Sequence, residues 1–193
     1  MIVRPTGSSI PMKNGVLILE CRHERDPGSE GRFLKHLFNL MAVESSYVRV
    51  AGRRELLRRI SRARYRYIHV STHGLVNDDD RFLGWWTAKG SGSRRFISQF
   101  RGVRPITAIV STACRSGAAG FARHVVGELG CRYYIAPQKS PTFYNAVLFA
   151  HVFYHKLFVT LKGAGVRRAF GGYRNAYKNP HKFSLVTRQK GER

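Results

Sequence analysis

The sequence predicts an α/β fold, an α/β/α sandwich with a mainly parallel central sheet. Short apolar and β-branched runs bounded by glycine, which are typical of buried strands, alternate with segments whose apolar residues recur at helical spacing. This alternation favours a parallel sheet covered by helices on both faces. Two of the runs, at 67–74 and 106–117, end in reactive side chains. Open α/β folds place their sites at the shared edge formed by the carboxyl ends of such strands.

The composition is that of one globular domain. A chain of 193 residues can bury a substantial core, and its 43% hydrophobic and 23% charged residues argue against disorder. We expect a loose leader over 1–14, one domain over 15–187 and a polar end over 188–193. Neither a transmembrane segment nor a secretory signal is evident, because basic residues interrupt the apolar stretches and residues 1–15 lack an apolar core. Three cysteines without CxxC spacing predict a reduced, cytoplasmic protein without disulfides or a zinc site.

The N-terminal half predicts three strands and two helices. The first run is apolar throughout, as in a strand buried on both faces. Ser29 follows the breakers Pro27 and Gly28, where it can cap the first helix. The arginines of the second helix form either a solvated face or an interaction surface. The expected strands are 16–21, 46–52 and 65–72, and the expected helices are 33–41 and 53–65.

The C-terminal half continues the same alternation. The turn-rich segment between His73 and residue 106 contains FLGWWTA, GSGS and RRFISQF, which predict a hairpin or a strand followed by a short helix. After it we expect strands from 106 to Cys114, at 131–137 and, as a final edge strand, at 181–186. The expected helices are 120–129, 143–162 and a segment after Gly165.

His73 and Cys114 are the main candidates for chemistry. A thiolate is a nucleophile, and a nearby imidazole can take the thiol proton and later protonate a leaving amine. The backbone N–H groups of Gly74 and Cys114 are candidates for an oxyanion hole. A lone cysteine is ordinarily a small buried hydrophobic residue, and a lone histidine at a strand end a satisfied polar contact. Their coincidence at the ends of two comparable strands favours a site.

The sequences STHG at 71–74 and STACRSG at 111–117 resemble those of the caspase-like cysteine peptidases of clan CD, most closely the bacterial CHAT-type domains. In that family a strand ends in His-Gly, and a later strand ends in an Ala-Cys-x-Ser-Gly-like signature. The order of the downstream elements is also similar, including FYHKL in a helix and NPHKFSL before a closing strand. The resemblance covers roughly residues 15 to 187 and implies a caspase-like sandwich.

The resemblance also implies an activity. His73 becomes the catalytic base and Cys114 the nucleophile of a dyad, with an oxyanion donor from Gly74. The implied reaction is endoproteolysis through a thioester acyl-enzyme, which needs no metal or organic cofactor. Relatives often work in prokaryotic stress, defence or cell-death systems, so we expect a protein substrate and an activating or sensor protein as partners.

Several residues are candidates for substrate selection. Metacaspase-like relatives carry an acidic residue two positions before the cysteine and select basic substrates, whereas this chain has Thr112 there. Caspases select aspartate with arginine, and Arg22 or Arg25 lies in the loop after the first strand. Asp78–Asp80 bind a basic side chain or calcium, or form an exposed turn. The loop at 138–145 lines the cleft or is only a connector.

The charge supports a second hypothesis. A formal charge of +23 from 34 basic and 11 acidic residues attracts nucleic acid, anionic membranes or acidic proteins, or gives merely solvated basic faces. Acidic residues are nearly absent after Asp80, where only Glu128 and Glu192 follow. The alternative to a peptidase is therefore a non-hydrolytic basic module on the same fold that recruits nucleic acid or an acidic protein.

Overall fold

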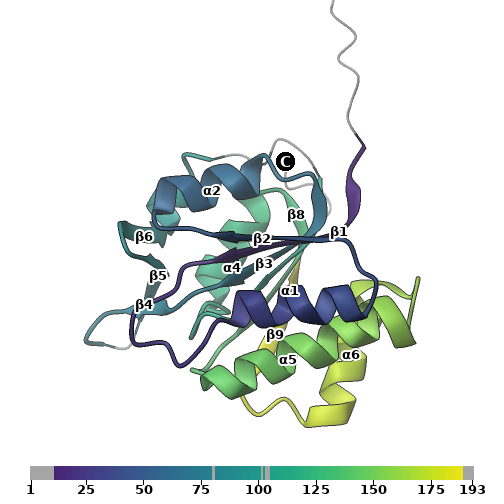
Figure 1. Cartoon of the computed structure of the whole chain (residues 1–193). Helices are drawn as coiled ribbons and strands as arrows, with labels where there is room; N and C mark the ends of the chain where they lie inside the picture. Colours follow the sequence, from purple (N-terminus) through teal and green to yellow (C-terminus); the bar gives the residue numbers. More distant parts are fainter. Residues whose placement is uncertain (1–10, 80, 101, 103–104, 189–193) are drawn as a thin grey trace, which may run out of the picture.

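The computed structural model describes residues 11–79, 81–100, 102 and 105–188, and it confirms the α/β/α architecture (Figure 1). Six strands form the central sheet in the order β2-β1-β3-β7-β8-β9, and all neighbouring pairs are parallel except β8 with β9. The strands in sheet order are β2 (Ser45–Arg49), β1 (Lys13–Glu20), β3 (Tyr65–Ser71), β7 (Ile106–Ser111), β8 (Cys131–Pro137) and β9 (Phe183–Thr187). The expected final edge strand is thus present, and it runs antiparallel.

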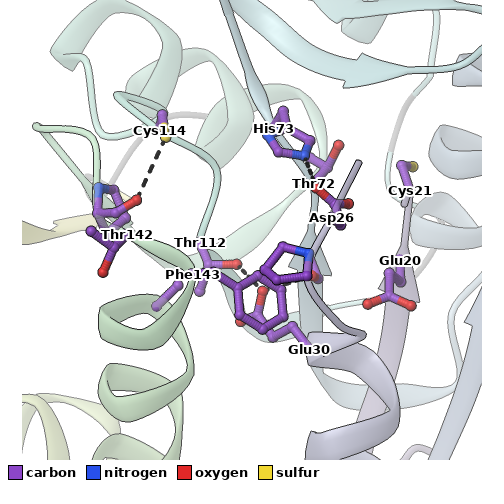
Figure 2. A pocket seen from close by; sticks show the side chains of 14 residues that line it. Glu20, Cys21, Asp26, Glu30, Thr72, His73, Thr112, Cys114, Thr142 and Phe143 are labelled. Atoms are coloured by element: carbon purple, nitrogen blue, oxygen red, sulfur yellow. Dashed lines mark hydrogen bonds and ion pairs between the residues drawn. The ribbon is translucent and has the colours of Figure 1, made fainter. Parts of the chain in front are cut away.

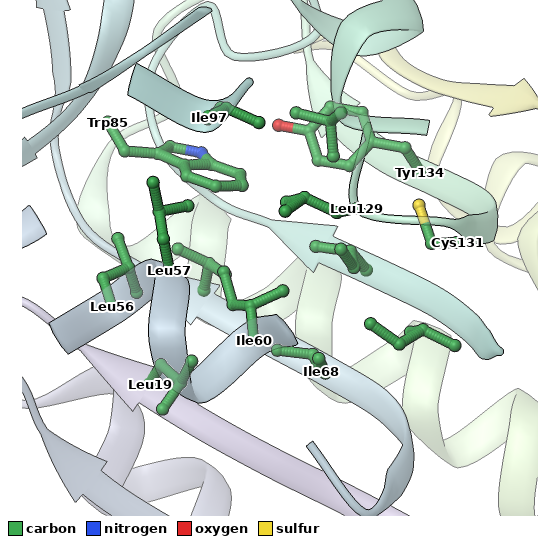
Figure 3. Close-up of a cluster of buried hydrophobic side chains, with 14 of the residues drawn as sticks. Leu19, Leu56, Leu57, Ile60, Ile68, Trp85, Ile97, Leu129, Cys131 and Tyr134 are labelled. Carbon is green, nitrogen blue, oxygen red and sulfur yellow. The ribbon is translucent and has the colours of Figure 1, made fainter. Parts of the chain in front are cut away.

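Helices cover both faces of this sheet, as expected. Helices α1 (Glu30–Leu40), α5 (Phe143–His155) and α6 (Gly165–Tyr177) pack on one face, where their apolar side chains share a core with one side of the strands. Helices α2 (Arg53–Ser61), α3 (Arg94–Ile97) and α4 (Ala119–Glu128) cover the other face. Figure 3 shows this second core, in which Ile60 of α2 lies near Ile68 of β3.

Local signals explain several helix ends. The Ser29 hydroxyl accepts a hydrogen bond from the N–H of Arg32, so the expected cap of α1 is confirmed. Gly130 follows α4 with a φ of +68°, a left-handed conformation that favours glycine at the end of a helix. The expected helix at 143–162 is divided into α5 and a short π-helical segment, η1 (Lys156–Thr160). No helix in the described ranges is long and apolar enough to cross a membrane.

A small antiparallel sheet projects beyond the carboxyl ends of the central strands. It consists of β4 (Gly74–Val76), β5 (Phe82–Thr87) and β6 (Gly90–Ser93), and α3 follows directly. The segment therefore contains both of the structures its sequence predicted, a hairpin and a short helix. The indole of Trp85 in β5 is fully buried and donates a hydrogen bond of 3.0 Å to Ser111 Oγ at the end of β7, which fastens the small sheet to the large one.

The predicted leader and polar end lie only partly within the described ranges. Residues 1–10 and 189–193 are outside them. Strand β1 begins at Lys13, so two residues assigned to the leader belong to the first strand. The N–H of Lys13 donates to the carbonyl of Arg64, which ties this end of β1 to the segment entering β3.

Candidate active site

A pocket of about 120 Å³ lies at the carboxyl ends of the parallel strands (Figure 2). The segments that follow β1, β3, β7 and β8 all contribute to its lining. The lining includes residues from the ends of both β1 and β3, the two strands from which the strand order proceeds in opposite directions. Ligand sites of open α/β sheets are found at such a switch point. Its walls include both His73 and Cys114, so the fold brings the two predicted residues to one cavity.

The His73 ring contacts one carboxylate and two other rings. Its Nε2 lies 2.6 Å from Asp26 Oδ1, a carboxylate in the loop after β1. The ring also stands edge-on to Trp86 and His23, at centroid distances of 6.0 and 6.1 Å. Because Asp26 occupies Nε2, the nitrogen left for exchange with a substrate or thiol is Nδ1.

Asp26 is itself fixed by its own loop. Its second carboxylate oxygen accepts a hydrogen bond of 2.8 Å from the N–H of His23, and its N–H donates to the His23 carbonyl. The Asp26 side chain is only 14% exposed, whereas that of His73 is 51% exposed. Asp26 could not be recognised from the sequence, because only the folded loop after β1 reveals that this carboxylate meets His73.

Cys114 occupies the opposite wall of the pocket (Figure 2). It is half-buried, and its Sγ lies 3.9 Å from the carbonyl oxygen of Pro141, in the loop after β8. Arg115, the next residue, has a φ of +60°, and its N–H donates to the Lys139 carbonyl. In this structure the thiol and the imidazole therefore face the same cavity with separate hydrogen-bond partners.

The turn that carries Cys114 is held from below. Ser116 Oγ donates to the carbonyl of Ala113 at 2.7 Å and lies 3.0 Å from Ser111 Oγ. The buried hydroxyl of Tyr134 donates to the Ser116 carbonyl at 3.2 Å. Polar side chains thus satisfy the backbone of this tight turn, which keeps Cys114 in place.

Gly74 and Cys114 pack backbone against backbone. A Cβ atom on Gly74 would stand 1.9 Å from the carbonyl oxygen of Cys114, so only glycine permits this approach. The N–H of Trp86 donates to the His73 carbonyl, and the antiparallel alternation then places Gly74 opposite Trp85 at a non-hydrogen-bonded position. The N–H of Gly74 consequently points away from β5, which leaves it open to another acceptor. The predicted oxyanion donors, Gly74 and Cys114, are neighbours.

The three thiols have different environments. Cys21 and Cys131 are buried, and burial raises the pKa of each thiol from 9.0 to about 12. Both therefore stay protonated at neutral pH and react poorly. Cys114 is the most accessible of the three.

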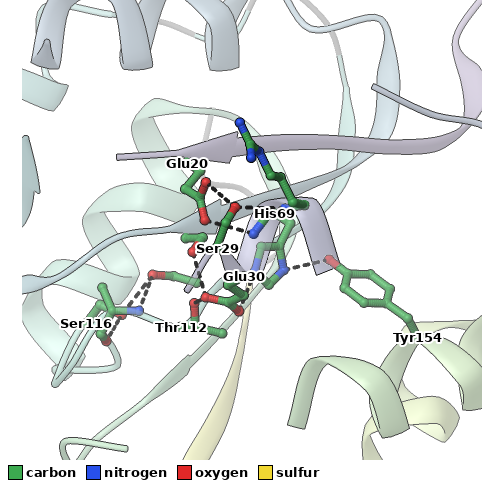
Figure 4. A network of polar contacts seen from close by, with 12 residues as sticks. Glu20, Ser29, Glu30, His69, Thr112, Ser116 and Tyr154 are labelled. Carbon is green, nitrogen blue, oxygen red and sulfur yellow. Dashed lines mark hydrogen bonds and ion pairs between the residues drawn. The ribbon is translucent and has the colours of Figure 1, made fainter. Parts of the chain in front are cut away.

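A buried polar network forms the floor of the pocket (Figure 4). Glu30, at the start of α1, accepts hydrogen bonds from Ser71 and Thr112 at 2.6 and 2.8 Å and lies 3.0 Å from His69 Nε2. The other ring nitrogen of His69 lies 3.2 Å from the hydroxyl of Tyr154 in α5. Burial alone would raise the pKa of the Glu30 carboxyl, but the charge of His69 and these hydrogen bonds outweigh it and lower that pKa.

The residues considered for substrate selection lie in different places. The Thr112 hydroxyl is engaged by Glu30, although Thr112 still lines the pocket. Arg22 donates to the carbonyl of Asp26 at 3.4 Å, and Arg25 is exposed. Neither arginine is among the described lining residues, which include the acids Glu20, Asp26 and Glu30 and no lysine or arginine.

Two further candidates can be placed. Asp78 and Asp79 lie in an exposed turn, where Asp79 accepts from the amide of Asn77, and Asp80 falls outside the described residues. The loop at 138–145 does contribute to the pocket, through Pro141, Thr142 and Phe143.

Comparison with known proteins gave no match, either among protein-family models or among curated proteins.

Proposed function

We propose that this chain is a cysteine endopeptidase of the caspase-like class, with Cys114 as nucleophile and His73 as general base. One observation carries the proposal: Cys114 and an imidazole anchored by Asp26 line the same pocket, at the switch point of the sheet. A thiol, an imidazole and a carboxylate that orients it make up a nucleophile, a base and a positioning group.

In the proposed reaction, His73 Nδ1 takes the proton of the Cys114 thiol, and the thiolate attacks the carbonyl carbon of the scissile peptide bond. The oxyanion that forms is stabilised by the N–H groups of Gly74 and Cys114. The C–N bond then breaks, the imidazolium gives its proton to the leaving amine, and a thioester remains. Water, deprotonated by the same imidazole, hydrolyses the thioester and restores the thiol.

Cys114 must first leave its contact with the Pro141 carbonyl. Its Sγ has to turn from the loop after β8 toward His73, and such hydrogen bonds often form only when substrate is bound. We propose that substrate, or an activating partner protein, provides this adjustment through the 138–145 loop.

The charges that line the pocket indicate which type of substrate residue can precede the scissile bond. Three carboxylates and no lysine or arginine line the described pocket, so an aspartate side chain would meet like charges. We therefore propose a neutral or basic residue at this position. Peptide substrates that differ only there test this: faster cleavage after aspartate than after leucine or arginine would contradict it.

Labelling with a fluorescent iodoacetamide tests the nucleophile. We expect one fast-labelling site at neutral pH, lost in Cys114→Ala and slowed in His73→Ala, because the thiolate is the reactive form. Cys131→Ala is the matched control and should label like the wild type, since the pKa of Cys131 is about 12. Equal labelling of the wild type and Cys114→Ala would refute the proposed nucleophile. Peptidase activity that persists in Cys114→Ala would do the same.

A further inference from the structure

A strongly basic groove lies outside the candidate active site, along α6 and the turn that leads to β9. Two adjoining hollows of about 550 and 620 Å³ share Arg174, Asn179 and Lys182 in their linings. Arg167 lines the first hollow, and Asn175 and Lys178 line the second. We call this surface, defined by these six residues, the α6–β9 groove.

The groove concentrates positive charge without carboxylates. Four cationic side chains line it, and no aspartate or glutamate is among its described lining residues. Arg174, Lys178 and Lys182 are exposed, and the ion pairs of the described chain all lie elsewhere. Closely spaced cations that lack acidic neighbours create a potential that attracts polyanions.

The turn that presents two of these cations is rigidly built. Lys178, Asn179 and Lys182 have φ angles of +45°, +48° and +48°, a conformation that side chains other than glycine seldom adopt. The Asn179 side chain holds the turn by accepting from the N–H of Phe183 at 2.8 Å and donating to its carbonyl at 2.7 Å. The N–H of Lys182 donates to the carbonyl of Asn179. Lys178 and Lys182 therefore project from a fixed frame.

Polar groups at the groove, and one exposed aromatic ring on the same helix, are suited to nucleic acid. Asn175 and Gln138 add exposed side-chain amides that can bond phosphate or sugar oxygens. Of the large apolar side chains that are exposed in the described chain, only Tyr177 lies on α6 or β9, and it is 41% exposed. Membrane-binding surfaces present several apolar side chains for insertion, whereas a single aromatic ring beside a basic groove can stack on a base.

We propose that the α6–β9 groove binds the phosphodiester backbone of nucleic acid, with Arg174, Lys178 and Lys182 as its main phosphate contacts. This site is distinct from the pocket of Cys114 and His73 and does not depend on the proposed peptidase activity. Binding through backbone contacts is sequence-independent and strongly salt-dependent.

Fluorescence anisotropy with labelled single-stranded DNA and RNA of the same sequence tests this proposal. We expect the full chain to bind both, and Arg174→Gln/Lys178→Gln/Lys182→Gln to weaken binding by more than about tenfold. The slope of log K against log salt should also fall in magnitude by about 2–3 in this variant.

Arg58→Gln/Arg62→Gln/Arg64→Gln is the matched control. It removes the same charge from a second basic surface, at the end of α2, and should retain binding within a few-fold. Cys114→Ala should bind like the wild type, which separates this proposal from the peptidase.

Three results would overturn the proposal. Equal loss in the two triple variants would show that diffuse charge, not the groove, attracts the polymer. If neither the DNA nor the RNA oligonucleotide bound at physiological salt, the proposed site would be excluded. Binding that depends on the groove for vesicles with phosphatidylserine, but not for the oligonucleotides, would assign the surface to membranes.

Discussion

At the scale of single residues, Asp26 is the side chain on which the geometry of His73 depends. Its carboxylate lies 2.6 Å from Nε2 and fixes both the ring position and the nitrogen that faces the pocket. For the proposed peptidase we expect Asp26→Asn to lower kcat by about 10²-fold with little change in KM, because misorienting the proposed base affects the chemical step more than binding.

Glu24→Gln is the matched control for Asp26, since Glu24 is an exposed carboxylate in the same loop. Its turnover of a peptide substrate should equal that of the wild type. If Asp26→Asn raised KM and left kcat unchanged, Asp26 would be assigned to substrate binding instead.

Gly74 is the second residue with a specific requirement. In Gly74→Ala the new Cβ would clash with the carbonyl oxygen of Cys114 and come close to its carbonyl carbon. Both are backbone atoms. Backbone cannot yield as a flexible side chain does, so we expect a loss of unfolding free energy of at least about 1–3 kcal/mol and loss of labelling at Cys114.

Gly127→Ala offers the comparison for this prediction. Gly127 lies in α4, and a Cβ there meets nothing within 4 Å. Urea unfolding should show Gly127→Ala to be as stable as the wild type or slightly more stable. A Gly74→Ala variant of unchanged stability would mean that the two backbones are further apart than the structure shows.

At the scale of elements, Glu30 connects four segments. It begins α1 and bonds the side chains of β3 and of the turn after β7, and through His69 it reaches α5. The carboxylate thus links the two strands that carry His73 and Cys114 to the helices on one face. It therefore has a structural role at the pocket floor.

The lowered pKa of Glu30 predicts how stability depends on pH. The folded state binds the Glu30 proton less tightly than the unfolded chain does, so the ionised Glu30 carboxylate stabilises the folded state. This stabilisation is fully present above a pH of 4.5, the ordinary pKa of a glutamate carboxyl. It is lost as the pH falls through the lower folded pKa. In Glu30→Gln the amide can still accept from the hydroxyls and donate to a neutral His69.

We therefore expect Glu30→Gln to lose less stability than the wild type between neutral pH and about pH 3. Urea unfolding across this range measures the difference. Parallel pH profiles for the two proteins would show that Glu30 is not the titrating group.

The sequence predicted most elements because their signals are local. The apolar run of β1, the Ser29 cap and the glycine after α4 each act over a few residues. The predicted helix at 53–65 was too long, because Tyr65 pairs in β3 and α2 ends at Ser61. Such a boundary depends on tertiary pairing, which periodicity does not contain.

The same difference between local and tertiary signals applies to the residues of the pocket. His73 and Cys114 were recognisable because each follows a strong strand directly. Asp26 and Glu30 were not, because their partners are 47 and 39 to 82 positions away and only the sheet edge unites them. A buried acid at the start of a helix looks like an ordinary first-turn glutamate until its neighbours are known.

At the scale of the whole molecule, the central sheet separates two hydrophobic cores, one on each of its faces. Phe149 of α5 joins three elements, with its ring stacked on Phe183 of β9 and edge-on to Tyr173 of α6. We expect Phe149→Ala to lower the unfolding free energy by about 3–5 kcal/mol. Tyr144→Ala, at a 70% exposed position of the same helix, should change it little. Similar urea midpoints for both variants would contradict this role of Phe149.

The two adjacent tryptophans differ in a way that has an optical consequence. Trp85 is enclosed by Phe121 and Tyr134, whereas Trp86 stands against His23 and His73, at centroid distances of 5.3 and 6.0 Å. Because a protonated imidazole quenches indole emission on contact, Trp85→Phe leaves a chain whose only fluorescent indole reports the charge of these two rings. Emission followed during titration, or during the approach of a substrate, then reads the state of the proposed base directly in solution.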